Sequence, residues 1–161
     1  MSSSFEGSEV FKAPPEKILS LINNFELYKD FLPGCLESSR LPNSKEGYVI
    51  GRLVFSLLNK TYVFESENET KGYQVRITQT KGPFLDFFAL WTIEIVNDNY
   101  TKVIFKTKFT LPFVLRVIAS QSMIDKIGSM FINAFENQLR KWRLTCLFQY
   151  PQATRDLKLI L

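Results

Sequence analysis

The sequence has no histidine among its 161 residues and only two cysteines, Cys35 and Cys146, which lie far apart. Without an imidazole base, the chain can form neither a Cys-His nor a Ser-His-Asp nucleophilic site. Two distant cysteines make neither a disulfide framework nor a zinc site, which needs three or four ligands. These absences predict a protein of a reducing compartment that holds no metal.

Other catalytic and targeting signals are missing as well. The seven glycines form no phosphate-binding loop, and no acid and base can be paired by spacing alone. The longest apolar run, at 84–96, is interrupted by Asp86 and Glu94, so no membrane span of about eighteen residues exists. The start, MSSSFEGSEVF, resembles neither a secretory signal nor a transit peptide. We therefore predict a non-catalytic cytoplasmic protein without a transmembrane segment.

Apolar residues, in contrast, make up 45% of the chain and include fifteen phenylalanines, which is enough for the core of one domain. The pattern predicts a strand at 4–11, a helix opened by Pro14 and Pro15, and a second short helix at 26–32 that ends at Pro33-Gly34. Period-two alternation then predicts strands at 48–57, 60–67, 73–80, 90–96 and 100–109. Their short connections favour an antiparallel meander.

A long amphipathic helix is predicted from about residue 110 to Arg143. Its apolar stripe consists of Phe113, Val117, Ile124, Ile127, Phe131, Phe135, Leu139 and Trp142. Gly128 and the run at 120–122 are places where this helix could bend. We predict one domain over 1–143 and a partly ordered tail over 144–161, in which the helical period is lost. The fold class is α+β, with a curved antiparallel sheet packed around the helix.

Four phrases give the chain a family resemblance. They are YKDFLPGC at 28–35, KGPF at 81–84, FKTKFT at 105–110 and MFINAF at 130–135. In this order they resemble the coenzyme Q-binding and ribosome association toxin RatA family, within the START-like, polyketide cyclase-like superfamily. The resemblance covers about residues 3 to 143. It implies a helix-grip fold with an apolar cavity between the sheet and the last helix.

The resemblance also implies which inward residues line that cavity, although a solid core explains the same pattern. The expected lining residues are Phe31, Leu32, Tyr73, Val75, Trp91, Ile93, Phe105, Phe109, Ile127, Phe131, Phe135 and Gln138. If a quinone binds, Gln138 is the first candidate to donate to its carbonyl. Cys35 is expected to be a small packing residue at the turn after the second helix.

The apolar loop at 84–88 is a second feature that suggests binding. Phe84, Leu85, Phe87 and Phe88 are more apolar than a surface loop usually is. Such a loop covers the mouth of a cavity, enters the edge of a lipid layer, or simply packs against the core. Peripheral contact with the inner face of a membrane is therefore left open.

A basic face is the third feature. Its predicted members are Lys102, Lys106, Lys108, Arg140, Lys141 and Arg143, in a chain with a formal charge of +4. A solvated surface explains such a face, and so does contact with rRNA phosphates or anionic lipid.

Two functions follow from the resemblance and from these features. The first is binding of a hydrophobic small molecule, with ubiquinone implied by the resemblance, in support of respiration; no cofactor is expected. The alternative is a translation inhibitor that binds the large ribosomal subunit and blocks subunit joining.

Overall fold

The computed structural model of the protein describes residues 2–42 and 45–149. The strands are β1 (Ser3–Phe11), β2 (Cys35–Leu41), β3 (Tyr48–Leu57), β4 (Lys60–Lys71), β5 (Gln74–Lys81), β6 (Asp86–Ile95) and β7 (Thr101–Thr110). The helices are α1 (Pro15–Asn23), the 3-10 turn η1 (Phe25–Leu27), α2 (Tyr28–Phe31), α3 (Phe113–Arg116) and α4 (Gln121–Gln149).

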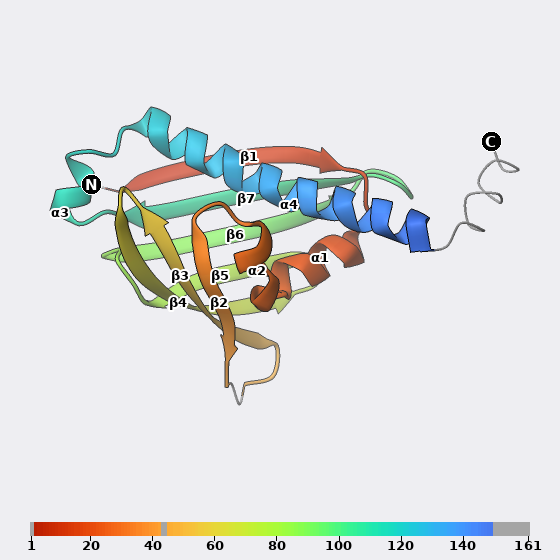
Figure 1. The fold of residues 1–161 in the computed structure, drawn as a ribbon, viewed down its shortest axis with the longest axis horizontal. Helices are drawn as coiled ribbons and strands as arrows, with labels where there is room; N and C mark the ends of the chain where they lie inside the picture. Colours follow the sequence, from red (N-terminus) through yellow and green to blue (C-terminus); the bar gives the residue numbers. More distant parts are fainter. Residues whose placement is uncertain (1, 43–44, 150–161) are drawn as a thin grey trace, which may run out of the picture.

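The strands form one antiparallel sheet in the order β1-β7-β6-β5-β4-β3-β2. Six of them follow one another through short turns, and β1 joins the edge by pairing with β7, as Ser3 opposite Phe109 illustrates. The sheet curves around α4, and α1 and α2 cover the rest of its concave face (Figure 1). This confirms the predicted α+β helix-grip fold, with its two short helices after the first strand.

Two strand boundaries differ from the prediction by more than one residue, and one strand was missed. β2 was not predicted as a separate strand. β6 begins at Asp86 because its first residue pairs with Thr110 of β7, and the Thr110 hydroxyl donates to Asp86 Oδ2 over 2.7 Å. β4 continues to Lys71 because it pairs along its length with β3 and β5.

The single long helix that was predicted is two helices. α3 and α4 are separated at 117–120, and the Ser120 hydroxyl accepts a hydrogen bond of 3.1 Å from Met123 N at the start of α4. Phe113 and Val117 were therefore wrongly assigned to the buried stripe, since they are 73% and 71% exposed. α4 also runs beyond Arg143 to Gln149. The remainder of the predicted tail, 150–161, lies outside the described residues.

Gly128 does not bend α4, which is continuous through this position. It lies under the ring of Phe5, and an added Cβ would stand 2.6 Å from that ring. The glycine therefore lets α4 approach β1 closely. No helix in the described part of the chain is long and apolar enough to cross a membrane.

The half of the molecule nearer α1 has a solid aromatic core. Trp91 is fully buried, and its ring lies 5.0 Å from that of Phe135 and 4.6 Å from that of Phe105. Ile132 and Leu139 of α4 and Leu21 of α1 complete this cluster. The second half of α4 is therefore fixed by dense packing.

Candidate ligand cavity

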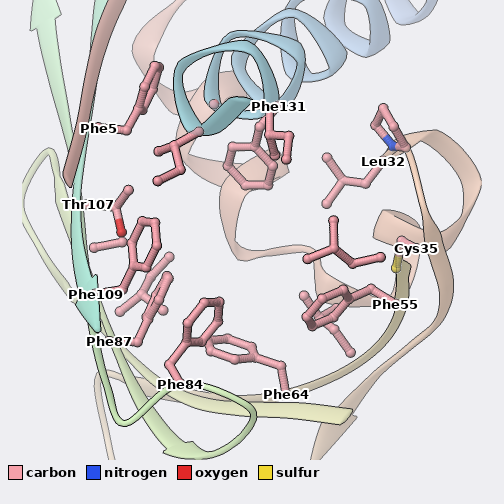
Figure 2. Close-up of a pocket in the computed structure, with 18 of the residues that line it drawn as sticks. Phe5, Leu32, Cys35, Phe55, Phe64, Phe84, Phe87, Thr107, Phe109 and Phe131 are labelled. Atoms are coloured by element: carbon pink, nitrogen blue, oxygen red, sulfur yellow. The ribbon is translucent and has the colours of Figure 1, made fainter. Parts of the chain in front are cut away.

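A cavity of about 340 Å³ lies between the concave face of the sheet and the first part of α4. Figure 2 shows phenylalanine rings surrounding an open space. The aromatic residues that line it are Phe5, Phe25, Tyr28, Phe55, Phe64, Phe84, Phe87, Phe105, Phe109 and Phe131. A space of this size among side chains that pack densely elsewhere is a candidate ligand site.

Part of the cavity floor consists of short side chains. Ala89 and Thr107 face each other across β6 and β7, and Ala89 also pairs with Ile77 of β5. Ser66 of β4 occupies the next part of the floor. Side chains of this length do not reach the helix above them, so the concave side of the sheet stays unfilled there.

The lining carries no charged side chain among the described residues. Two of its hydroxyl groups have partners within the protein. Ser66 Oγ donates to Asn68 Oδ1 over 3.2 Å, and Thr107 Oγ1 donates to the Phe88 carbonyl over 3.0 Å. Because an ionised group is strongly disfavoured in such surroundings, the cavity suits a neutral molecule.

Cys35 and Tyr28, the most acidic groups in the lining, stay protonated at neutral pH. Burial raises the pKa of the Cys35 thiol, whose Sγ lies 3.4 Å from the Glu37 carbonyl. Burial is the main cause that raises the pKa of Tyr28, and repulsion from the Cys35 thiolate, when it forms, is the second. The Tyr28 hydroxyl donates to the Ile22 carbonyl. Neither group is prepared as a nucleophile or a base.

No group of three or more His, Cys, Asp or Glu side chains within 2–42 and 45–149 could hold a metal ion.

Residues 11–136 match the family model described as polyketide cyclase/dehydrase and lipid transport. The chain belongs to this family.

Curated proteins with a similar sequence include bacterial toxins. Ribosome association toxin RatA of Vibrio cholerae is 24% identical over 127 residues, which cover 78% of this chain and 88% of the relative. Persistence and stress-resistance toxin PasT of Escherichia coli is 22% identical over 121 residues, which cover 74% of this chain and 76% of the relative. The chain therefore resembles RatA, as its four phrases predicted.

Solved structures of the same fold include a START superfamily protein of Mycobacterium smegmatis, with a TM-score of 0.74 and 16% identity over 86% of this chain and 98% of the other. The Zhui aromatase/cyclase of a Streptomyces species matches with a TM-score of 0.75 and 12% identity over 88% of this chain and 95% of the other. At these identities the likeness establishes the START-like fold of this family member.

Five of the twelve residues expected in the lining border the cavity. They are Leu32, Phe105, Phe109, Ile127 and Phe131. They come from the end of α2, from β7 and from α4, and Figure 2 shows Leu32, Phe109 and Phe131 on different sides of the space.

The other seven lie outside the lining, which corrects the prediction. Phe31, Val75, Trp91, Ile93 and Phe135 belong to the solid core or pack against it. Tyr73 is 38% exposed, and its hydroxyl donates to Glu16 Oε1 over 3.0 Å. Gln138 is half-buried on α4 and does not border the cavity; its role as the donor to a quinone carbonyl stays a prediction.

The predicted loop at 84–88 consists of the end of the β5–β6 loop, at Phe84 and Leu85, and the first three residues of β6, and its side chains are divided between the cavity and solvent. Phe84 and Phe87 line the cavity, whereas Leu85 is 67% exposed and Phe88 is 39% exposed. The Gln79 side chain fixes the loop, since its Nε2 donates to the Phe84 carbonyl over 2.9 Å and its Oε1 accepts from Phe84 N over 3.3 Å.

Two of the three strand lysines of the predicted basic face have acidic neighbours. Lys106 lies 3.4 Å from Glu6, and Lys102 lies 4.0 Å from Glu94. The charge of these two lysines is therefore partly neutralised within the sheet. Lys108 is exposed.

The other three residues of the predicted basic face lie on the later part of α4. Arg140 pairs with Glu136 over 3.1 Å, and Arg143 donates to the Lys12 carbonyl over 3.3 Å. Lys141 is exposed on the same stretch. The six residues thus belong to two separate elements, β7 and the later part of α4.

Several lining residues were missed by sequence reasoning. Leu53 and Phe55 of β3 and Phe64 of β4 face the cavity, and Leu53 is paired with Phe64. Their period-two spacing was the available signal, because residues at alternate positions of one strand share a face.

Replacing Cys35 with alanine is expected to leave ligand binding within about twofold and to cost at most about 1 kcal/mol of stability, because its thiol is protonated and only half-buried. Ligand titration and denaturant unfolding of Cys35→Ala check this. Selective loss of binding in a stable variant would contradict a packing role.

Proposed function

We propose that the protein binds a neutral hydrophobic lipid in this cavity, and that the lipid is an isoprenoid such as ubiquinone. The observation that carries the proposal is a cavity of about 340 Å³ without a charged lining residue among those described. The match to a family that includes lipid transport supports it. Burial of apolar surface, about 25 cal/mol per Å², supplies the binding energy.

The cavity volume restricts how much of such a lipid is enclosed. Ligand pockets span about 300–1,000 Å³, and this one is near the lower limit. The cavity accommodates a ring and the first part of a tail. The remainder of a long isoprenoid chain leaves through the mouth.

The proposed role is non-catalytic, although the family contains cyclases. The described lining offers no carboxylate, amine or imidazole, and the raised pKa of Cys35 and of Tyr28 keeps both neutral. General acid-base catalysis needs a group whose pKa is close to the working pH.

Titration with a short-chain ubiquinone tests the proposal. Trp91 adjoins two lining residues, with its ring 4.6 Å from Phe105 and 5.7 Å from Phe131. We expect saturable quenching of tryptophan fluorescence at one equivalent. A fatty acid carboxylate of similar length should bind more weakly, because no lining cation neutralises it. Absence of saturable quenching would contradict the proposal for ubiquinone.

Ribosome binding is the second candidate function. The names of the RatA relatives favour it, and exposed Lys108, together with the basic residues of α4, would supply contacts to phosphate. The ion pairs of Lys102 and Lys106 reduce the strength of such contacts.

Salt separates the two functions. Docking on rRNA through the six basic residues should weaken steeply as salt rises, because neutralised phosphates release counterions, whereas uptake of a neutral quinone should hardly change. Substituting Lys102, Lys106 and Lys108 with glutamine should reduce ribosome co-sedimentation several-fold and leave quinone titration unchanged. Ribosome association that responds to neither salt nor these substitutions would place the docking surface elsewhere.

A further inference from the structure

One end of the molecule presents apolar side chains to solvent. β3, β5 and β7 all end there, and the segments that follow them lie on the left in Figure 1. The exposed side chains are Leu58 (45%), Leu85 (67%), Phe113 (73%), Val114 (67%), Val117 (71%) and Ile118 (50%). These six residues are called the rim patch. Isolated exposed apolar residues are ordinary, but a group of six marks an interaction surface.

α3 and the turn after it expose mainly apolar side chains; Arg116, the charged residue of α3, is half-buried and donates to the Leu111 carbonyl over 3.4 Å. Leu115 is buried and packs with Leu111 and Phe109. Phe113 and Val117, on the outward side, are the two most exposed members of the rim patch. A surface helix in water normally has a polar outer face, so this segment is better suited to an apolar medium on both sides.

The rim patch is continuous with the cavity wall. Leu58 belongs to both, and Leu111, Leu115 and Ala119 line the cavity directly beneath the exposed residues. A route from the outside of this end into the cavity would therefore be lined by apolar side chains.

Leu58 also has an unusual backbone conformation. It occupies the left-handed region at φ 52° in the turn between β3 and β4, next to Asn59 at φ 62°. Asparagine and glycine are favoured there, whereas a bulky apolar residue is disfavoured. A strained residue of this kind is found where an exposed side chain has a function.

Cations accompany the rim patch. Lys60 is the first residue of β4, directly after the turn at Leu58 and Asn59, and Lys81 is the last residue of β5, before the loop that carries Leu85. Both are exposed, and neither forms an ion pair with a described carboxylate. Apolar side chains flanked by lysines are complementary to a bilayer that contains anionic lipid.

We propose that the rim patch inserts into the surface of an anionic bilayer, which places the cavity mouth against the acyl chains. The inference rests on the proposed function, because a lipid-binding cavity needs a route to lipid. It assigns the main contact to α3 and the turn after it, while Phe84 of the neighbouring loop and Phe87 of β6 line the cavity.

Co-flotation with vesicles of phosphatidylcholine and phosphatidylglycerol tests the inference. The Phe113→Asp/Val117→Asp double variant should lose roughly tenfold or more of its vesicle affinity, because two charges replace two inserted apolar groups. Its thermal unfolding should be unchanged, since both side chains are exposed in water. The wild-type protein should bind vesicles of phosphatidylcholine alone more weakly.

The matched control is Ile95→Asp/Val96→Asp at the opposite end of the sheet, where the exposures are 57% and 56%. It should float like the wild type. Equal flotation of both double variants, or no flotation of the wild type, would overturn the membrane assignment.

A concentration-dependent dimer that Phe113→Asp/Val117→Asp abolishes would instead assign the rim patch to a second copy of the chain. Titration of the same variant with short-chain ubiquinone in solution tests the cavity separately and should remain saturable.

Discussion

Replacing Thr107 with phenylalanine is expected to reduce lipid binding by more than tenfold, about 1.4 kcal/mol, while the free energy of unfolding stays constant or rises. Thr107 lies on the cavity floor beside Ala89, and Figure 2 shows its side chain at the open space. A ring there would occupy the space that the ligand needs. Filling a void contributes about 0.5–2 kcal/mol, which offsets about 1 kcal/mol for the lost hydrogen bond to Phe88.

The matched control is Thr107→Val, which has nearly the same shape and leaves the cavity open. It should retain binding within a few-fold and lose only the contribution of the hydroxyl group. Titration with short-chain ubiquinone and denaturant unfolding measure both quantities. A folded Thr107→Phe protein with undiminished binding would show that the ligand does not occupy this cavity.

Phe135→Ala is expected to destabilise the protein by about 3–5 kcal/mol, the usual cost of truncating a buried phenylalanine. Only 1% of Phe135 is exposed. Its ring lies 5.4 Å from Tyr28, 5.1 Å from Phe131 and 5.0 Å from Trp91. Its removal would loosen α4 from the sheet. Denaturant unfolding measures the change.

Phe113→Ala provides the comparison for Phe135, since it removes the same side chain from a position that is 73% exposed. Its cost should lie within about 0.5 kcal/mol. If Phe135→Ala were equally mild, the later part of α4 would not be held by a solid core, and the separation of that core from the cavity would be wrong.

Period-two alternation was sufficient to predict most of the sheet. The predicted strand at 48–57 coincides with β3, and the inward direction of Trp91 and Phe105 is confirmed by their burial. Alternation predicts which face of the sheet a side chain occupies. It does not predict whether that side chain meets α4 or an empty space, which explains why Trp91 was assigned to the cavity lining.

The break before α4 was not predictable from the apolar period alone. Phe113 and Val117 fit the helical stripe, but α3 turns away from α4 and directs them outward. The run at 120–122 was named as a place where the predicted helix could bend, and the Ser120 hydroxyl accepts a hydrogen bond at the start of α4. At this end of the molecule, tertiary geometry overrides the local pattern.

Native mass spectrometry of the protein purified from its own cells, combined with extraction of the bound lipid, tests the central claim most directly. We predict one neutral prenyl lipid for each chain, and loss of that lipid in Thr107→Phe but not in Thr107→Val. A chain that carries no lipid and takes up no added ubiquinone, or one that holds the same lipid in both variants, would contradict a ligand site in the cavity.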